Sequence, residues 1–129
     1  EEGGMLDMLK DIGVLMLTSI SEGMPLVVLE SMAAGIPVVA TDVGACREII
    51  EGGTDEDKAL GQCGAVAPVM DATRLAQEAV SLLNDENRWR DCRKTAIERV
   101  ERYYSLTGMI ETYNDIYKGL TNNHGRNRD

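Results

Sequence analysis

GVLMLTSISEGMPLVVLESMAAGIPVVATD, residues 13–42, contains the pattern from which the architecture can be predicted. Residues 13–19 form a continuous apolar run that ends in small hydroxyl side chains, which is typical of a strand buried on both faces. Residues 25–35 begin at a proline, place apolar side chains three and four positions apart, and end at a glycine, which predicts a helix. Residues 36–42 are short and β-branched, so they predict the next strand.

The same alternation continues downstream. Residues 43–53 predict a short helix, residues 54–62 a polar acidic loop, and residues 64–68 a third strand. The three remaining helices are predicted from their apolar faces: Leu75, Ala79, Leu82 and Leu83 after the capping residue Asp71; Trp89, Cys92, Ala96, Val100 and Tyr103; and Leu106, Met109, Ile110, Tyr113, Tyr117 and Leu120. The order predicts an α/β fold with a Rossmann-like, doubly wound parallel sheet.

The predicted sheet has fewer strands than an independent parallel sheet usually has. The chain begins at Glu1 with helical spacing and without an obvious cap, so we expect it to be part of a longer protein. We assign residues 1–120 to the C-terminal part of a domain and residues 121–129 to a polar tail, expected to be disordered.

Composition restricts the classes of function. The formal net charge of −9 argues against sequence-independent binding to nucleic acid or to an anionic membrane, because both need a basic surface. The longest apolar run is far shorter than the roughly 20 residues that span a bilayer, so we expect no membrane insertion. Cys46, Cys63 and Cys92 are scattered, which favours reduced core thiols in the cytoplasm. His124 is the single histidine, which excludes a histidine triad or a multi-histidine metal site.

The loop SISEGMP, residues 19–25, falls where open α/β sheets bind ligands, beyond the carboxyl end of a strand and before a helix. Backbone amides and about half a positive charge at the helix start favour a phosphate. Gly23 allows close backbone approach, and Pro25 lacks only an amide that helix geometry leaves unpaired. Glu22 can accept hydrogen bonds from sugar hydroxyls, and Glu30 can reach back toward the same edge to bind a ribose diol. The pattern predicts a nucleotide-sugar site.

The spacing of the two glutamates decides little by itself. Glu48 with Glu56 repeats it, as does Glu78 with Glu86, so a solvated loop residue and a helix surface charge remain the simple alternative. The turn at residues 23–25 can also be plain helix-entry chemistry. Three further groups are expected to be structural or solvated: Asp42 and Gly44 at a strand-end turn, Arg47 and Glu48 on a solvated helix face, and Tyr103, Tyr104, Tyr113 and Tyr117 in core or interdomain packing.

SISEGMPLVVLESMAAGIPVVATDVGACREIIEG, residues 19–52, resembles the donor-site signature of family 4 retaining glycosyltransferases, whose E-x7-E motif lies between S…EG.P and LE.MA.G.PVVAT.VG…E.I. The resemblance continues through GAVAPVMDATRLAQEAVSLLNDENRWR to YYSLTGMIETYNDIYKGL and covers roughly residues 5–120. LTSISEGMPLVVLE, VATDVGACREII and IERVERYY are most similar to the cytoplasmic glycosyltransferases of Pel exopolysaccharide synthesis.

The resemblance implies a role for each matching position. Glu22 matches the first motif glutamate, beside the donor sugar, and is expected to act as a positioning and electrostatic catalytic residue. Glu30 matches the second, which binds the ribose hydroxyls. The turn that meets the sugar and the diphosphate is matched by Gly23, Met24, Pro25, Leu26 and Val27. The family uses no metal in this site and no cofactor is implied; the leaving diphosphate would help to take the acceptor proton.

The chain departs from the family in extent. The family has the two-domain GT-B fold, and the chain corresponds to the second half of the C-terminal domain, without the acceptor domain or the upstream Arg and Lys that bind the diphosphate. We therefore expect the chain alone to be inactive and, through an unpaired sheet edge, to self-associate. EGGTDEDKALGQCG, residues 51–64, is longer than the usual loop of the family.

The expected partners of the longer protein are a nucleotide-sugar donor, which the resemblance implies to be UDP-glucose, and a glycan acceptor. Two other functions stay open at this point. A sugar-nucleotide epimerase of the non-hydrolysing kind shares the architecture, but would not be expected to combine this E-x7-E with AGIPVVAT. A degenerate copy could bind a nucleotide without turnover.

Overall fold

The computed structural model describes residues 12–124, except the side chains of Tyr113, Ile116, Tyr117 and residues 119–124. Three parallel strands lie in the order β1 (Leu15–Leu17), β2 (Val38–Thr41) and β3 (Gly64–Ala67). In register, Val39 of β2 lies between Met16 of β1 and Ala65 of β3. The outer edges of β1 and β3 have no strand partner within residues 12–124.

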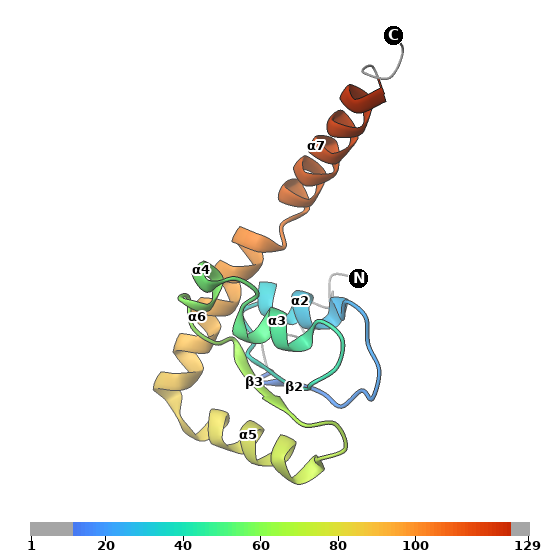
Figure 1. Cartoon of the computed structure of the whole chain (residues 1–129). Helices are drawn as coiled ribbons and strands as arrows, with labels where there is room; N and C mark the ends of the chain where they lie inside the picture. Colours follow the sequence, from blue (N-terminus) through green and yellow to red (C-terminus); the bar gives the residue numbers. More distant parts are fainter. Residues whose placement is uncertain (1–11, 125–129) are drawn as a thin grey trace, which may run out of the picture.

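Helices cover both faces of the sheet, as the prediction of a doubly wound fold requires (Figure 1). On one face, Val38 and Ala40 pack with α2 (Leu26–Ala33) and α3 (Cys46–Glu51). On the other face, Val39 and Ala65 pack with α5 (Ala72–Asn84) and the first part of α6 (Glu86–Tyr103). The apolar side chains of β2 are fully buried on both faces, because each face has its own helical layer.

The boundaries of α2 follow from its flanking residues. Pro25 is the N-cap, with φ −77° and ψ 98°, so the helix begins one residue after the proline and not at it. Gly35 adopts a φ of 73° after the helix, a conformation that glycine tolerates at little cost. The Ile36 amide donates to the Ser31 carbonyl at 2.9 Å and starts the return to β2. The predicted strand, loop, helix and strand order of this segment is confirmed.

The predicted acidic loop at residues 54–62 contains a short helix, α4 (Asp55–Lys58), so the loop assignment was wrong there. Thr54 caps this helix by accepting a hydrogen bond from the Asp57 amide at 3.2 Å. Asp57 in turn accepts from the Gly53 amide at 2.9 Å. The threonine and aspartate three residues apart form a capping arrangement strong enough to fix one helical turn in a polar segment.

Helix α6 crosses the amino ends of all three strands. Its side chains donate hydrogen bonds to backbone carbonyls in the segments that lead into β1, β2 and β3. The pairs are Trp89 Nε1 with Gly13 O, Arg93 Nη1 with Gly35 O, Thr95 Oγ1 with Leu60 O, and Arg99 Nη2 with Gly61 O. One helix therefore holds the three strand entrances together.

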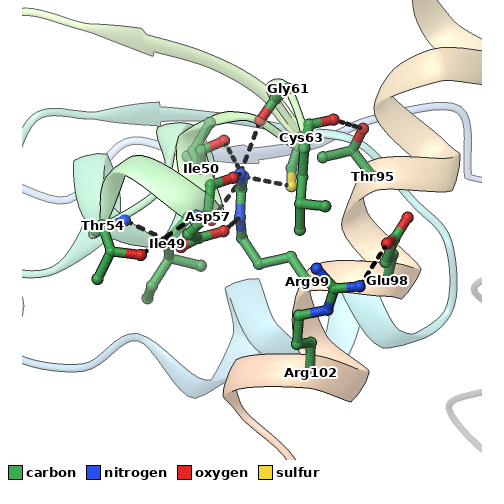
Figure 2. A network of polar contacts seen from close by, with 12 residues as sticks. Ile49, Ile50, Thr54, Asp57, Gly61, Cys63, Thr95, Glu98, Arg99 and Arg102 are labelled. Carbon is green, nitrogen blue, oxygen red and sulfur yellow. Dashed lines mark hydrogen bonds and ion pairs between the residues drawn. The ribbon is translucent and has the colours of Figure 1, made fainter.

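Arg99 is completely buried and has a polar partner for each guanidinium nitrogen (Figure 2). Its Nε lies 2.5 Å from Asp57 Oδ1, and its Nη2 donates to the Asp57 carbonyl at 2.8 Å. Its Nη1 donates to Ile50 O at 2.7 Å, at the C-terminal end of α3, and to Cys63 Sγ at 3.0 Å. Because a buried charge is stable only when it is paired and hydrogen-bonded, this network fixes α4 and the end of α3 against α6.

Helix α7 (Leu106–His124) extends away from the sheet (Figure 1). It continues through residues 121–124, which the sequence assigned to a disordered tail; residues 125–129 lie outside the described part. Leu106, Met109 and Ile110 are at least half exposed. Tyr103 is also exposed, whereas Tyr104 packs against the core, and Tyr113 and Tyr117 fall outside the described side chains.

Candidate donor-binding site

The β1–α2 loop, residues 18–25, lies at the carboxyl ends of the strands and is held by the β2–α3 loop, residues 42–45. The Ala45 amide donates to the Gly23 carbonyl at 3.0 Å. Gly44 has a φ of 51°, and a Cβ at this position would lie 2.3 Å from the Glu22 carbonyl oxygen. Only glycine fits there, so the expectation that Gly44 is structural agrees with the geometry, and its structural task is to let the two loops touch.

Glu22 is half-buried, with its carboxylate held by its own loop. Ser19 Oγ donates to Glu22 Oε1 at 2.6 Å. The charge of Glu22 affects the thiol of Cys46, at the start of α3. Burial raises the pKa of Cys46, and a hydrogen bond with the backbone of Val43 lowers it. The negative charges of Glu22 and Asp42 raise it further. The thiol of Cys46, at the start of the helix beside the β1–α2 loop, is therefore neutral at neutral pH.

The exposed face of α2 brings Glu30 together with the first helical turn. Leu26, Val27 and Glu30 are spaced four and three residues apart and are all exposed, with Leu26 at 66% and Val27 at 44%. Side chains on a helix tilt toward its N-terminus, so the Glu30 carboxylate projects back over the turn that contains Leu26 and Val27. The Glu30 side chain has no hydrogen bond or ion pair among the described residues, so both carboxylate oxygens are available there as acceptors.

Two backbone amides at the start of α2 have no hydrogen-bond acceptor among the described residues. Pro25 offers no side-chain cap, and the first turn contains no acidic residue. The Val28 amide donates to the Pro25 carbonyl at 3.0 Å, whereas within residues 12–124 no group accepts from the amides of Leu26 and Val27. Two free amides at a positive helix end are suited to bind an anion such as a phosphate.

Gly23 borders open space. A Cβ at this position would meet no atom of the described residues within 4 Å, and Gly23 is not among the glycines with positive φ. The protein itself therefore has no steric need for glycine here, in contrast to Gly44. Met24 beside it is 51% exposed. The sequence-predicted site residues thus lie together on the β1–α2 loop and one face of α2.

Arg47 is exposed, as expected, but it is more constrained than a solvated helix side chain. Its guanidinium contacts Asp42 at 2.7 Å and Glu51 at 2.9 Å. The hydrogen bonds that Arg47 donates to the carboxylates of Asp42 and Glu51 raise the pKa of Arg47 above its usual range. Because Asp42 follows β2 and Glu51 ends α3, the three side chains help to fix the β2–α3 loop against which Gly23 rests.

Sequence reasoning missed the residues that hold the loop. Thr41, at the end of β2, donates from Oγ1 to the Ser19 carbonyl at 2.5 Å. Two signals for these contacts were available: a threonine at the end of a strand, and a serine three residues before Glu22.

Other features of the described residues lie away from this loop. A cavity of about 710 Å³ is bordered by Leu60, Gly61 and the first turns of α6, at the amino ends of the strands, so it does not border Glu22 or Glu30. Within residues 12–124, no group of three or more acidic, histidine or cysteine side chains could hold a metal ion. In the same range, no helix is both long and apolar enough to span a membrane.

Known proteins are similar to this chain in sequence and in fold. N-acetyl-alpha-D-glucosaminyl L-malate synthase of Bacillus anthracis is 30% identical over 117 residues, which are 91% of this chain and 29% of that protein. The structure of sucrose-phosphate synthase from Thermosynechococcus elongatus superposes with a TM-score of 0.74 and 26% identity, covering 88% of this chain and 27% of that one. The C-terminal domain of a group 1 family glycosyl transferase from Francisella tularensis has the same fold, with a TM-score of 0.63, 23% identity, and coverage of 77% of this chain and 47% of that one.

The chain thus spans less than a third of the length of the first two relatives. The expected fold class, a partial C-terminal domain of GT-B architecture with a parallel α/β sheet, is confirmed. The family model described as "Glycosyl transferases group 1" matches residues 3–85, more than half of the chain and the whole of the β1–α2 loop. The chain therefore belongs to the group 1 glycosyl transferases.

Proposed function

We propose that this chain is the donor-binding part of a retaining glycosyltransferase that transfers a hexose from a nucleotide sugar to a glycan acceptor. One observation carries the proposal: within residues 12–124, the amides of Leu26 and Val27 and the carboxylate of Glu30 have no protein partner, on the helix that follows the loop of the half-buried Glu22. The two amides can donate hydrogen bonds to an anion, and the carboxylate can accept hydrogen bonds from a diol. These are the groups needed to bind the diphosphate and the ribose of a nucleotide sugar.

Each site residue has a distinct task in this proposal. The amides of Leu26 and Val27, with the dipole of α2, bind the diphosphate and stabilise the charge that grows on it as the glycosidic bond breaks. Glu30 accepts hydrogen bonds from the ribose hydroxyls. Pro25 starts the helix without competing for the anion, and Gly23 lets the backbone approach the donor. Met24 lies exposed beside the sugar position.

Glu22 is proposed as the catalytic residue. Its carboxylate would accept hydrogen bonds from the donor hexose and stabilise the positive charge that develops at the anomeric carbon. The leaving diphosphate takes the proton of the acceptor hydroxyl, so neither a metal nor another cofactor is required in this proposal.

The finer identity rests on sequence resemblance. LTSISEGMPLVVLE and VATDVGACREII support a place in Pel-type exopolysaccharide synthesis, with UDP-glucose as the donor. The relatives include an N-acetyl-alpha-D-glucosaminyl L-malate synthase and a sucrose-phosphate synthase, whose names give different products, so the family alone does not select an acceptor. Cytoplasmic location is proposed because the three cysteines are buried and free, and because nucleotide sugars are cytoplasmic substrates.

The test uses the full-length protein that contains this chain. UDP-glucose and other nucleotide sugars are supplied with candidate glycan acceptors, and both the released nucleotide and the glycan product are measured. We expect acceptor-dependent transfer that Glu22→Ala lowers at least a hundredfold in turnover, with donor affinity changed much less. Glu48 and Glu56 have the same eight-residue spacing as Glu22 and Glu30. The variants Glu48→Ala and Glu56→Ala should show normal sugar transfer.

The same assay separates the two rival functions. Donor conversion to an epimer without any acceptor would identify an epimerase and contradict the proposal. Donor binding without turnover on any acceptor would identify a nucleotide-binding module that has lost catalysis. Transfer that is unaffected by Glu22→Ala would show that the site has been placed wrongly.

The chain by itself is proposed to be inactive and to self-associate. Catalysis needs an acceptor held opposite the donor, which can account for about 7 to 11 kcal/mol of barrier lowering. The outer edges of β1 and β3 leave unpaired amides and carbonyls within the described residues, and Val80 and Leu83 of α5 are more than half exposed. Sedimentation over a concentration series should show oligomers, and a strictly monomeric chain would contradict this expectation.

A further inference from the structure

Ser19 makes the one side-chain hydrogen bond that Glu22 has within residues 12–124. The hydroxyl oxygen lies 2.6 Å from Glu22 Oε1, within the short range typical of an O–H donor to a carboxylate. The second carboxylate oxygen, Oε2, has no partner among the described residues. One oxygen is thus fixed by the protein, and the other is left to accept from a ligand.

Ser19 is itself fixed by the sheet. Thr41 is 5% exposed at the end of β2, and its Oγ1 donates to the Ser19 carbonyl at 2.5 Å. Since β2 is the central strand and is buried on both faces, Thr41 is a rigid reference point. A continuous path of two hydrogen bonds joins the central strand to the Glu22 carboxylate.

The neighbouring serine provides a contrast. Ser21 belongs to the same loop and lies next to Glu22 in the sequence, but it is exposed and its hydroxyl has no hydrogen bond among the described residues. Sequence proximity therefore does not explain the Ser19 contact. It depends on the loop geometry that Thr41 and Gly44 impose.

We infer that Ser19 is a positioning residue of the transfer reaction: its hydroxyl holds the Glu22 carboxylate so that Oε2 faces the donor hexose, and Thr41 holds Ser19. The inference rests on the proposed function, because it assigns Ser19 a task only if Glu22 acts on the donor. A glutamate side chain has three rotatable bonds, so an unrestrained carboxylate would spend most of its time away from the reactive position. The donor is bound mainly through groups that Ser19 does not touch.

The consequence is a loss in turnover with little change in donor KM. In the full-length enzyme, Ser19→Ala should lower kcat roughly tenfold, the effect expected for removing one hydrogen bond to a charged group. Ser19→Thr retains the hydroxyl and should restore at least half of the lost kcat. Ser21→Ala is the matched control and should leave kcat and KM unchanged.

Thr41→Val provides a second test that does not alter Ser19. It keeps the size of the side chain but removes the hydroxyl, so kcat should fall two- to fivefold with donor KM unchanged. In a Glu22→Ala background, neither Ser19→Ala nor Thr41→Val should lower kcat further, because both act through Glu22. Circular dichroism and thermal unfolding identify variants that are folded and can be compared.

The outcomes separate the two claims. If Glu22→Ala transfers sugar normally, the proposed function itself fails. If Glu22→Ala is impaired but folded Ser19→Ala and Thr41→Val have wild-type kcat, or lose donor affinity instead, the positioning role is wrong. A further fall in kcat when Ser19→Ala is added to Glu22→Ala would also overturn it. Loss of kcat alone, rescued by Ser19→Thr, supports it.

Discussion

The two ends of the sheet use their polar groups in opposite ways. At the amino ends of the strands, α6 donates hydrogen bonds to all three strand entrances, and Arg99 is buried with a partner for each nitrogen. At the carboxyl ends, the amides of Leu26 and Val27 and the carboxylate of Glu30 have no protein partner within residues 12–124.

The difference shows where stability and binding are located. A polar group that is satisfied inside the protein stabilises the fold but cannot bind anything else, whereas a preorganised group left open is available to a ligand. The carboxyl end is nevertheless not loose, because Thr41 and Gly44 hold the β1–α2 loop from the neighbouring strand. Changes at the amino end should therefore affect unfolding, and changes at the carboxyl end should affect donor binding.

The largest expected effect is on stability at the amino end. Arg99→Met removes one partner of the buried pair with Asp57 and leaves an uncompensated carboxylate, which should lower the free energy of unfolding by about 3 to 5 kcal/mol. Urea unfolding of the full-length protein, followed by a signal from this domain, measures the change.

Arg102→Met is the matched control for that variant. Arg102 lies on the same helix and pairs with Glu98 at 3.3 Å, but both side chains are exposed (Figure 2). Such a surface pair contributes about 0 to 1 kcal/mol. Equal losses in the two variants would show that the buried network is no more stabilising than a surface ion pair.

The second prediction concerns alkaline pH and again the amino end. Burial raises the pKa of the Cys63 thiol from 9.0 to about 12, although Arg99 partly opposes it. Above pH 9 the unfolded chain loses this proton while the folded protein keeps it, so the stability due to the neutral thiol is full below pH 9 and is lost between pH 9 and about 12.

Urea unfolding at a series of pH values tests this. The free energy of unfolding should fall as the pH rises above 9, and Cys63→Ala should make this fall smaller by about 1.4 kcal/mol for each pH unit. In both proteins a residual decline in stability should remain, because burial also raises the pKa of Cys46, of Cys92 and, from 10.0 to about 12, of Tyr104. Identical slopes with and without Cys63 between pH 9 and 10 would be evidence against a buried neutral thiol.

The third prediction compares two glycines at the carboxyl end. Gly44→Ala forces a Cβ to 2.3 Å from the Glu22 carbonyl oxygen at a φ of 51°, so it should cost about 1 to 3 kcal/mol of stability and displace the loop. Gly23→Ala meets open space and should change stability by less than about 0.5 kcal/mol. It should nevertheless weaken donor binding, because the methyl group occupies the space through which the backbone approaches the ligand.

Thermal unfolding and donor titration of both variants give the comparison. Undiminished donor affinity in Gly23→Ala would mean that the open space at Gly23 is not part of the site. A stable Gly44→Ala protein with normal transfer would mean that contact between the two loops is dispensable.

The order and type of the main elements were predictable because their signals are local. The apolar run that contains β1, the spacing of α2 and the glycine that follows it each express a period or a turn rule within a few residues. Helix α4 was missed because one turn is too short to show a period, although Thr54 and Asp57 carried the capping signal.

The supporting contacts were not predictable because they join residues far apart in the sequence. Arg99 reads as a surface residue by type, yet it follows Cys92 and Ala96 at helical spacing, and only the positions of Asp57 and Gly61 make its burial stable. Ser19 and Thr41 are likewise 22 residues apart, and their contact depends on strand pairing. The candidate site residues were predicted from a local motif, whereas the residues that support their loop became visible only in the structure.

The most direct measurement of the central claim is calorimetric titration of the full-length protein with UDP-glucose or the donor that the transfer assay identifies. Glu30→Gln should weaken binding roughly tenfold or more, because a neutral amide replaces a carboxylate acceptor whose hydrogen bonds are worth about 1.5 to 3 kcal/mol. Glu48 is an exposed glutamate on α3 whose side chain has no hydrogen bond among the described residues, so Glu48→Gln should bind the donor like the wild type. Equal affinity for the wild type, Glu30→Gln and Glu48→Gln would contradict the assignment of the open face of α2 as the donor site.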